Sequence, residues 1–96
     1  MSVYVIAQLK FKQRDLYDRY QSRFSGVFKN FVGKVLVAEE NPLVLEGEWP
    51  RDKVVMMEFP DADAAQNFLG SPEYQAIAVD RKAGADGVVL MLRGLG

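Results

Sequence analysis

The stretch FPDADAAQNFLGSPEYQAIAVDRKAGADGV, residues 59–88, decides the fold of this chain. It holds the end of one strand, two helices separated by a Gly-Ser-Pro break at residues 70–72, and the start of another strand. Asp61 or Asp63 is available to cap the first helix. Ser71 caps the second, with proline at the first helical position, where its missing N–H costs nothing. The stretch therefore predicts a strand, a helix pair and a strand.

Before this stretch, the spacing of apolar residues changes from a strand pattern to a helical pattern and back to a strand pattern. Residues 3–9 are short, apolar and β-branched, which predicts a buried strand. From Asp15 the apolar residues follow helical spacing, and Gly33 is the stop signal. Strands at residues 34–39, 53–59 and 88–93 are expected to follow, with an extended arm at residues 43–48 and turns at Asn41-Pro42 and Asp86-Gly87.

This order of elements predicts one domain, residues 1–96, of the α+β class. Two βαβ-like halves with right-handed crossovers give a ferredoxin-like βαββαβ fold, an antiparallel four-stranded sheet with helices on one face. RNA-recognition domains share this order, but their third strand carries a basic-glycine-aromatic pattern with exposed rings. Residues 53–57, KVVMM, have no such pattern. RNA binding is therefore not expected.

The strands are more apolar than a sheet with one covered face requires. Such a sheet should alternate apolar and polar residues, yet Val54 and Met56 lie opposite Val55 and Met57, and the first and last strands behave alike. The apolar face left open would exceed the few hundred Å² that monomers usually expose. We therefore predict a homodimer in which the same face of a second copy covers it.

The composition excludes several kinds of chemistry. The 96 residues include no cysteine and no histidine, and the net charge is −1. Disulfides, thiolate sites and the commonest general base near neutral pH are therefore absent, and we expect no metal and no tightly bound cofactor. A basic face for nucleic acid is also missing. The N-terminus has no signal-peptide pattern, and no apolar run approaches about 20 residues, so a cytoplasmic protein without membrane contacts is expected.

Short pieces of sequence occur in a characteristic order along nearly the whole chain: Gly33-Lys34, Leu45-Glu46-Gly47, Arg51, Val54-Val55, Phe59-Pro60, Ala65, Ser71-Pro72-Glu73-Tyr74-Gln75 and Arg81. In order and spacing they resemble the domain of unknown function 1330 family, within the dimeric α+β barrel superfamily. Two positions differ: Val32 precedes Gly33 where the family usually has Gly-Gly, and Phe68 stands where a tryptophan is common.

The resemblance implies a fold but no single function, because proteins of one fold can have many unrelated functions. The superfamily includes cofactor-free oxygenases of phenolic or quinol substrates, haem-handling enzymes, and small isomerases and dehalogenases. Haem ligation in these relatives generally uses a histidine. Since this chain has none, a ligated haem is not expected.

Arg81 and three tyrosines are candidates for a ligand site. Arg81 shares one helical face with Tyr74, and that face should point at the sheet. As a functional residue, Arg81 would anchor a substrate carboxylate or enolate beside Tyr74. As a structural residue, it would pair with a carboxylate or pack its stem on the core. Tyr17 and Tyr20 follow the apolar stripe of the first helix and belong either to a pocket mouth or to the core.

Glu58 is the candidate for proton transfer. It lies near the end of its strand in an apolar row, and Gln8 is expected near the same end of the first strand. A partly buried Glu58 would have a raised pKa and act as a general base. Alternatively, it is an interface or rim residue paired with an arginine such as Arg51 or Arg81. On the arm, Trp49 and Arg51 would cover a partner subunit or contribute to a substrate pocket.

Two functions remain open. In the first, the protein binds or transforms a small acidic or phenolic metabolite in a pocket between the sheet and the helices. Arg81 would hold the anion, Tyr20 and Tyr74 would orient it, and Glu58 would move a proton. In the second, the protein is a non-catalytic dimeric binding or interaction module. The absence of histidine and cysteine favours the second function, whereas the resemblance favours the first.

Overall fold

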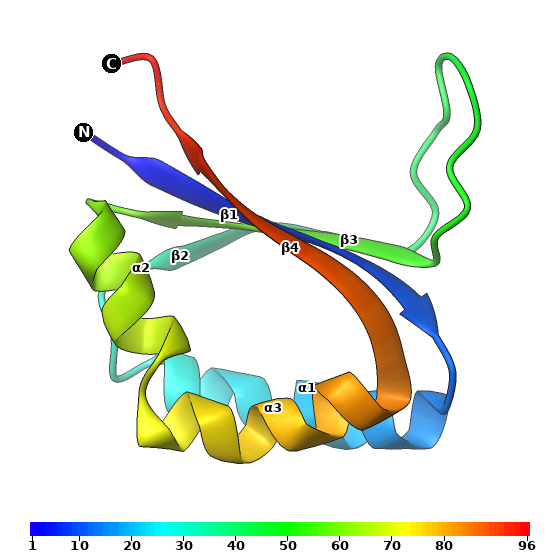
Figure 1. Cartoon of the computed structure of the whole chain (residues 1–96), viewed down its shortest axis with the longest axis horizontal. Helices are drawn as coiled ribbons and strands as arrows, with labels where there is room; N and C mark the ends of the chain where they lie inside the picture. Colours follow the sequence, from blue (N-terminus) through cyan, green and yellow to red (C-terminus); the bar gives the residue numbers. More distant parts are fainter.

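The computed structural model describes all 96 residues and has two layers, a sheet and a layer of helices on one of its faces (Figure 1). The four strands are antiparallel in the order β2-β3-β1-β4, so the ferredoxin-like α+β fold predicted from the sequence is confirmed. None of the helices has the length and hydrophobicity that crossing a membrane requires. The elements are β1 (Val3–Phe11), α1 (Arg14–Phe28), β2 (Lys34–Glu39), β3 (Lys53–Phe59), α2 (Ala62–Leu69), α3 (Pro72–Gly84) and β4 (Ala85–Arg93).

Side-chain caps define the helix pair as expected. The Asp61 carboxylate accepts a hydrogen bond from the N–H of Ala64 at 2.8 Å at the start of α2. The Ser71 hydroxyl accepts from the N–H of Tyr74 at 3.1 Å and donates to the Phe68 carbonyl at 2.7 Å. Ser71 thus ends α2 and begins α3 in one tight corner. This corner directs α3 under the sheet.

β4 begins earlier than the sequence suggested, at Ala85. Asp86-Gly87, which was expected to form a turn, instead pairs with the end of β1. The Gly84 carbonyl accepts hydrogen bonds from the N–H groups of Lys12 and Gln13 at 2.8 and 3.0 Å. Because this contact holds the end of α3 against the start of α1, the chain passes directly from helix to strand, and the predicted turn was wrong.

The close approach at Gly84 predicts opposite effects for two substitutions. A Cβ atom at position 84 would lie 2.6 Å from the backbone nitrogen of Tyr17. Gly84→Ala should therefore force α1 and α3 apart and lower the free energy of unfolding by about 1–3 kcal/mol. A Cβ atom at Gly26, within α1, would meet nothing within 4 Å. Gly26→Ala should raise stability by about 0.5–1 kcal/mol through helix propensity. Urea unfolding measures both, and a shift of the same sign would contradict the expectation.

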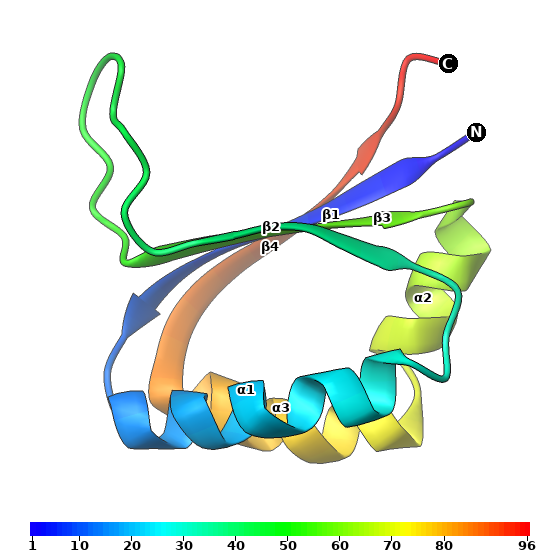
Figure 2. The same ribbon diagram turned by 180° about the vertical axis from the view of Figure 1, so that it is seen from behind.

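The strand register places alternate residues on the two faces of the sheet. Val5 and Leu9 of β1 and Met57 and Phe59 of β3 are buried under the helices. On the other face Ile6 of β1 lies between its partners in β3 and β4, and no helix covers this side (Figure 2). We call this surface the open face; its apolar side chains are Tyr4, Ile6, Val37, Val54, Met56, Val88, Leu90 and Leu92. The apolar character predicted for both faces is confirmed.

Residues 40–52, here called the arm, join β2 to β3 and stand away from the sheet on the side of the open face (Figures 1 and 2). The arm contains no strand. Its two ends are nevertheless held. The carboxylate of Glu40 accepts two hydrogen bonds from Arg14 at 2.9 Å, and Asp52 accepts one from a backbone N–H of β1 at 2.8 Å. The base of the arm is therefore anchored, while its tip extends from the fold.

Candidate functional site

A small cavity lies between the sheet and the helices. Arg81 is the only charged residue among the twelve that line it, and the other eleven are hydrophobic. We call it the tyrosine cavity, because Tyr17 and Tyr20 of α1 and Tyr74 of α3 belong to its wall. Its volume is about 50 Å³. That is room for a few water molecules, since one water needs about 10–15 Å³.

Two of these tyrosines join the helices through their hydroxyl groups. The Tyr20 and Tyr74 hydroxyl oxygens are 3.0 Å apart, and both side chains are buried. One hydroxyl donates to the other, so the accepting hydroxyl keeps a hydrogen that has no protein acceptor. Burial raises the pKa of Tyr20 well above its ordinary value; Tyr74 adds to this effect and the charge of Arg81 opposes it. Tyr20 therefore stays protonated near neutral pH, and the hydrogen-bonded pair offers a donor to the cavity.

Arg81 supplies a second donor without a partner. Its Nε atom is buried and makes no hydrogen bond, and none of the ion pairs of the chain includes its guanidinium. The ion pair that the structural interpretation expected is therefore not formed within one copy. The guanidinium lies beside β4, where a Cβ atom at Gly87 would be 3.7 Å from Nη1. A buried donor left unpaired costs about 1–3 kcal/mol, a cost that a bound acceptor would remove.

A second cavity of about 60 Å³ adjoins the first on the side of β2. The two cavities share Tyr17, Tyr20, Phe24 and Val55 as walls. Only Phe24 and Val55 of these four are partly exposed. Rotation of Phe24 would join the two spaces. A ligand carrying a ring requires such a movement, because pockets for drug-sized ligands occupy about 300–1,000 Å³.

Lys53 is a buried cation that the sequence analysis missed. Its Nζ atom donates to the side-chain oxygen of Gln21 at 3.2 Å and lies 4.9 Å from the centre of the Tyr17 ring. Burial lowers the pKa of Lys53, and the charge of Glu40 opposes this effect. Burial also raises the pKa of Tyr17 to about 12. The alternation that places Phe59 under the helices applies equally to Lys53, so the signal was present in the sequence.

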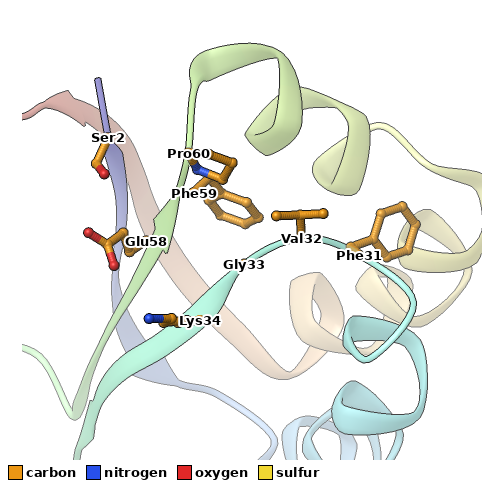
Figure 3. A pocket seen from close by; sticks show the side chains of 8 residues that line it. All are labelled: Ser2, Phe31, Val32, Gly33, Lys34, Glu58, Phe59 and Pro60. Atoms are coloured by element: carbon orange, nitrogen blue, oxygen red, sulfur yellow. The ribbon is translucent and has the colours of Figure 1, made fainter.

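Glu58 lies on the opposite face of the sheet from the tyrosine cavity. It lines a shallow groove of about 470 Å³ on the protein surface (Figure 3). The Glu58 and Lys34 side chains project to the same side from paired positions of β3 and β2, near Ser2. The prediction that Gln8 lies beside Glu58 is wrong. Because β1 and β3 are antiparallel, Glu58 pairs with Tyr4, and Gln8 lies at the other end of the sheet.

The arm holds the remaining predicted residues. The indole nitrogen of Trp49 donates to the side-chain oxygen of Gln8 at 3.2 Å, which ties the arm to the open face. Arg51 lies near the base of the arm, makes no ion pair and does not line the tyrosine cavity. The structure thus brings together Arg81 and the two bonded tyrosines, and it leaves Glu58 and Arg51 elsewhere.

Family membership follows from the sequence as a whole. Residues 2–95 match the model of the domain of unknown function named DUF1330. The chain belongs to this family. The resemblance seen in the short sequence pieces is confirmed, and the match covers the open face, the arm and the tyrosine cavity alike. No curated protein matches this DUF1330 chain in sequence.

Several solved structures share the fold of this DUF1330 protein. A protein of unknown function from Rhodopseudomonas palustris is 20% identical, with a TM-score of 0.82 over 99% of this chain and 83% of that one. A dimeric ferredoxin-like protein of unknown function from Jannaschia sp. CCS1 is 14% identical, with a TM-score of 0.79 over 98% and 100% of the two chains. SnoaB, a cofactor-independent oxygenase from Streptomyces nogalater, is 14% identical, with a TM-score of 0.71 over 99% and 94%. At these identities the likeness shows the fold alone.

Proposed function

We propose that this DUF1330 protein is a homodimer that binds a small carboxylate or phenolate in the tyrosine cavity, without a tightly bound cofactor. The observation that carries the proposal is the buried, unpaired Nε atom of Arg81 on the wall of an otherwise hydrophobic cavity. The free hydrogen of the Tyr20–Tyr74 pair is the second donor. Since the cavity offers donors and a positive charge but no carboxylate, it selects an acceptor that carries negative charge.

The size of the cavity narrows the ligand class. A volume of about 50 Å³ fits the head group of a small acid rather than a fused ring system. The carboxylate or phenolate oxygen would lie between Arg81 and the tyrosine hydroxyls. A longer ligand would extend into the adjoining cavity of about 60 Å³ after Phe24 has moved.

The chemistry of the cavity supports binding rather than catalysis. No carboxylate or amine lines it, so it holds no general base. Glu58, the candidate for proton transfer, lies beyond the sheet. The raised pKa of Tyr20 suits a hydrogen-bond donor and not a base. Cofactor-independent oxygenation, as in SnoaB, is the second candidate function, and it is favoured by the shared fold.

The homodimer is proposed from the open face. The chain exposes 6143 Å², whereas a compact monomer of 10.8 kDa is expected to expose about 5,500 Å². Apolar side chains of the open face are part of this exposed surface: Val88, Leu90 and Leu92 of β4 are each at least 40% exposed. Solved structures with the same fold from Jannaschia and Thermobifida fusca are described as dimeric. A second copy placed face to face would cover this surface.

Thermal shift and calorimetric titration with acetate, pyruvate and benzoate test the ligand site. We expect at least one of these acids to stabilise the protein, by about 2.7 kcal/mol at one hundred times its Kd. Arg81→Gln should weaken that binding by about 10- to 100-fold, the loss of one charged hydrogen bond. Lys82→Gln, on the exposed side of α3, changes the net charge equally and should bind like wild type. Binding unaffected by Arg81→Gln, or no binding of any acid, would show the proposal to be wrong.

A further inference from the structure

The tip of the arm carries apolar side chains that nothing in one copy covers. Leu43 is 84% and Leu45 is 88% exposed, and Val44 between them is also exposed. These residues line an open groove of about 470 Å³ between the arm and the open face. Consecutive exposed aliphatic residues on a projecting segment mark an interaction site. The tip of the arm is therefore a candidate surface for contact with another molecule.

β4 is the other apolar surface without cover. It is an edge strand that pairs only with β1, and all five residues from Val88 to Leu92 are exposed, so both of its faces are accessible. Val89 is 44% exposed although it faces the helices and lines the tyrosine cavity. The cavity is therefore poorly covered at β4. A face-to-face dimer alone would cover the open side of β4 and leave Val89 in water.

The reach of the arm connects these two surfaces. Sheets that pack face to face lie about 10 Å apart. Each limb of the arm has about six residues and spans up to roughly 20 Å when extended. In a face-to-face dimer the arm of one copy must therefore extend past the sheet of the other copy and lie along its margin. The bonds from Arg14 to Glu40 hold the base of the arm in this direction.

We infer that the arm of each copy packs its tip, Leu43–Leu45, along β4 of the second copy and completes the wall of that copy's tyrosine cavity. β4 is favoured over the other edge strand because its apolar run is the longer and because it borders the cavity. The charges of the two surfaces are also complementary, since the arm carries carboxylates and β4 carries an arginine. Glu46 and Glu48 of the arm and Arg93 of β4 take part in no ion pair within one copy. Two-fold symmetry makes the contact twice.

Cross-linking tests this placement, because the chain has no cysteine and every engineered thiol is unique. Leu45→Cys and Val89→Cys proteins, one of them tagged, are unfolded together, refolded and treated with a short bismaleimide. We expect the mixed product to exceed that of Leu45→Cys with Val79→Cys by about tenfold or more, since the arm raises the effective concentration of its thiol. Val79 is 65% exposed on the outer side of α3 and serves as the matched control.

Other products would overturn the inference. A predominant link from Leu45→Cys to Val35→Cys would place the arm on β2 of the second copy, and a predominant link between two Leu45→Cys chains would place the arms against each other. Leu43→Cys with Met91→Cys repeats the test if the first pair folds poorly. The inference rests on the proposed homodimer, and it rests on the proposed ligand only where it assigns one to the cavity. Cross-linking measures the arm alone, so it succeeds or fails independently of any acid binding.

Discussion

Replacing Leu90 by aspartate is expected to convert the proposed homodimer into a monomer. Leu90 lies in the middle of β4 on the open face, paired with Ile6, and is 46% exposed in a single copy. Because the symmetric interface contains the position twice, each dimer would bury two carboxylates without partners. An uncompensated buried charge costs about 3–5 kcal/mol, so self-association should weaken by on the order of 1,000-fold or more.

Sedimentation equilibrium over a range of protein concentrations measures this effect. Val79→Asp adds the same charge on the outer side of α3 and should remain dimeric. Circular dichroism should show both variants folded, since neither side chain belongs to the core. A wild-type protein that stays monomeric at all concentrations, or a Leu90→Asp protein that dimerises normally, would refute the proposed use of the open face.

Truncating Phe68 to alanine is expected to cause the largest loss of stability. Phe68 is fully buried, and its ring lies 4.6 to 5.9 Å from five other aromatic rings: those of Phe24, Phe28, Phe31, Phe59 and Tyr74. Removing a ring from such a site costs about 3–5 kcal/mol. Domains of this size have a total stability of about 5–15 kcal/mol. The melting temperature should therefore fall by roughly 15–30 °C.

Thermal unfolding followed by circular dichroism provides the test. Phe31→Ala is the matched control, because Phe31 touches the same cluster but is only partly buried, and its loss should be clearly smaller. Phe68→Leu keeps most of the volume and should cost less than the alanine substitution. Equal losses for Phe68→Ala and Phe31→Ala would mean that the ring cluster is not centred on Phe68.

Local signals in the sequence were sufficient for most of the fold. The caps at Asp61 and Ser71 and the alternation of β3 act over a few residues, so they can be read without knowing the rest of the molecule. The shared helical face of Tyr74 and Arg81 likewise predicted that both would point at the sheet, and both line the same cavity.

Long-range geometry was less accessible. The antiparallel pairing of β1 and β3 separates Gln8 from Glu58, and it depends on how the whole chain is connected rather than on either strand. The early start of β4 depends on the contact between Gly84 and the N-terminus of α1. The bond between Tyr20 and Tyr74 depends on the distance between two helices, which no spacing along the sequence encodes.

The exposed edge of β4 also affects how long a single chain remains in solution before it aggregates. Its outer edge presents unpaired backbone groups beside five consecutive apolar residues, Val88 to Leu92, which is the pattern that seeds fibril growth. Only the charges of Asp86 and Arg93 flank this run and oppose stacking. A chain diluted away from its second copy is therefore the species prone to aggregate, so association would protect the protein in solution as well as enclose its cavity.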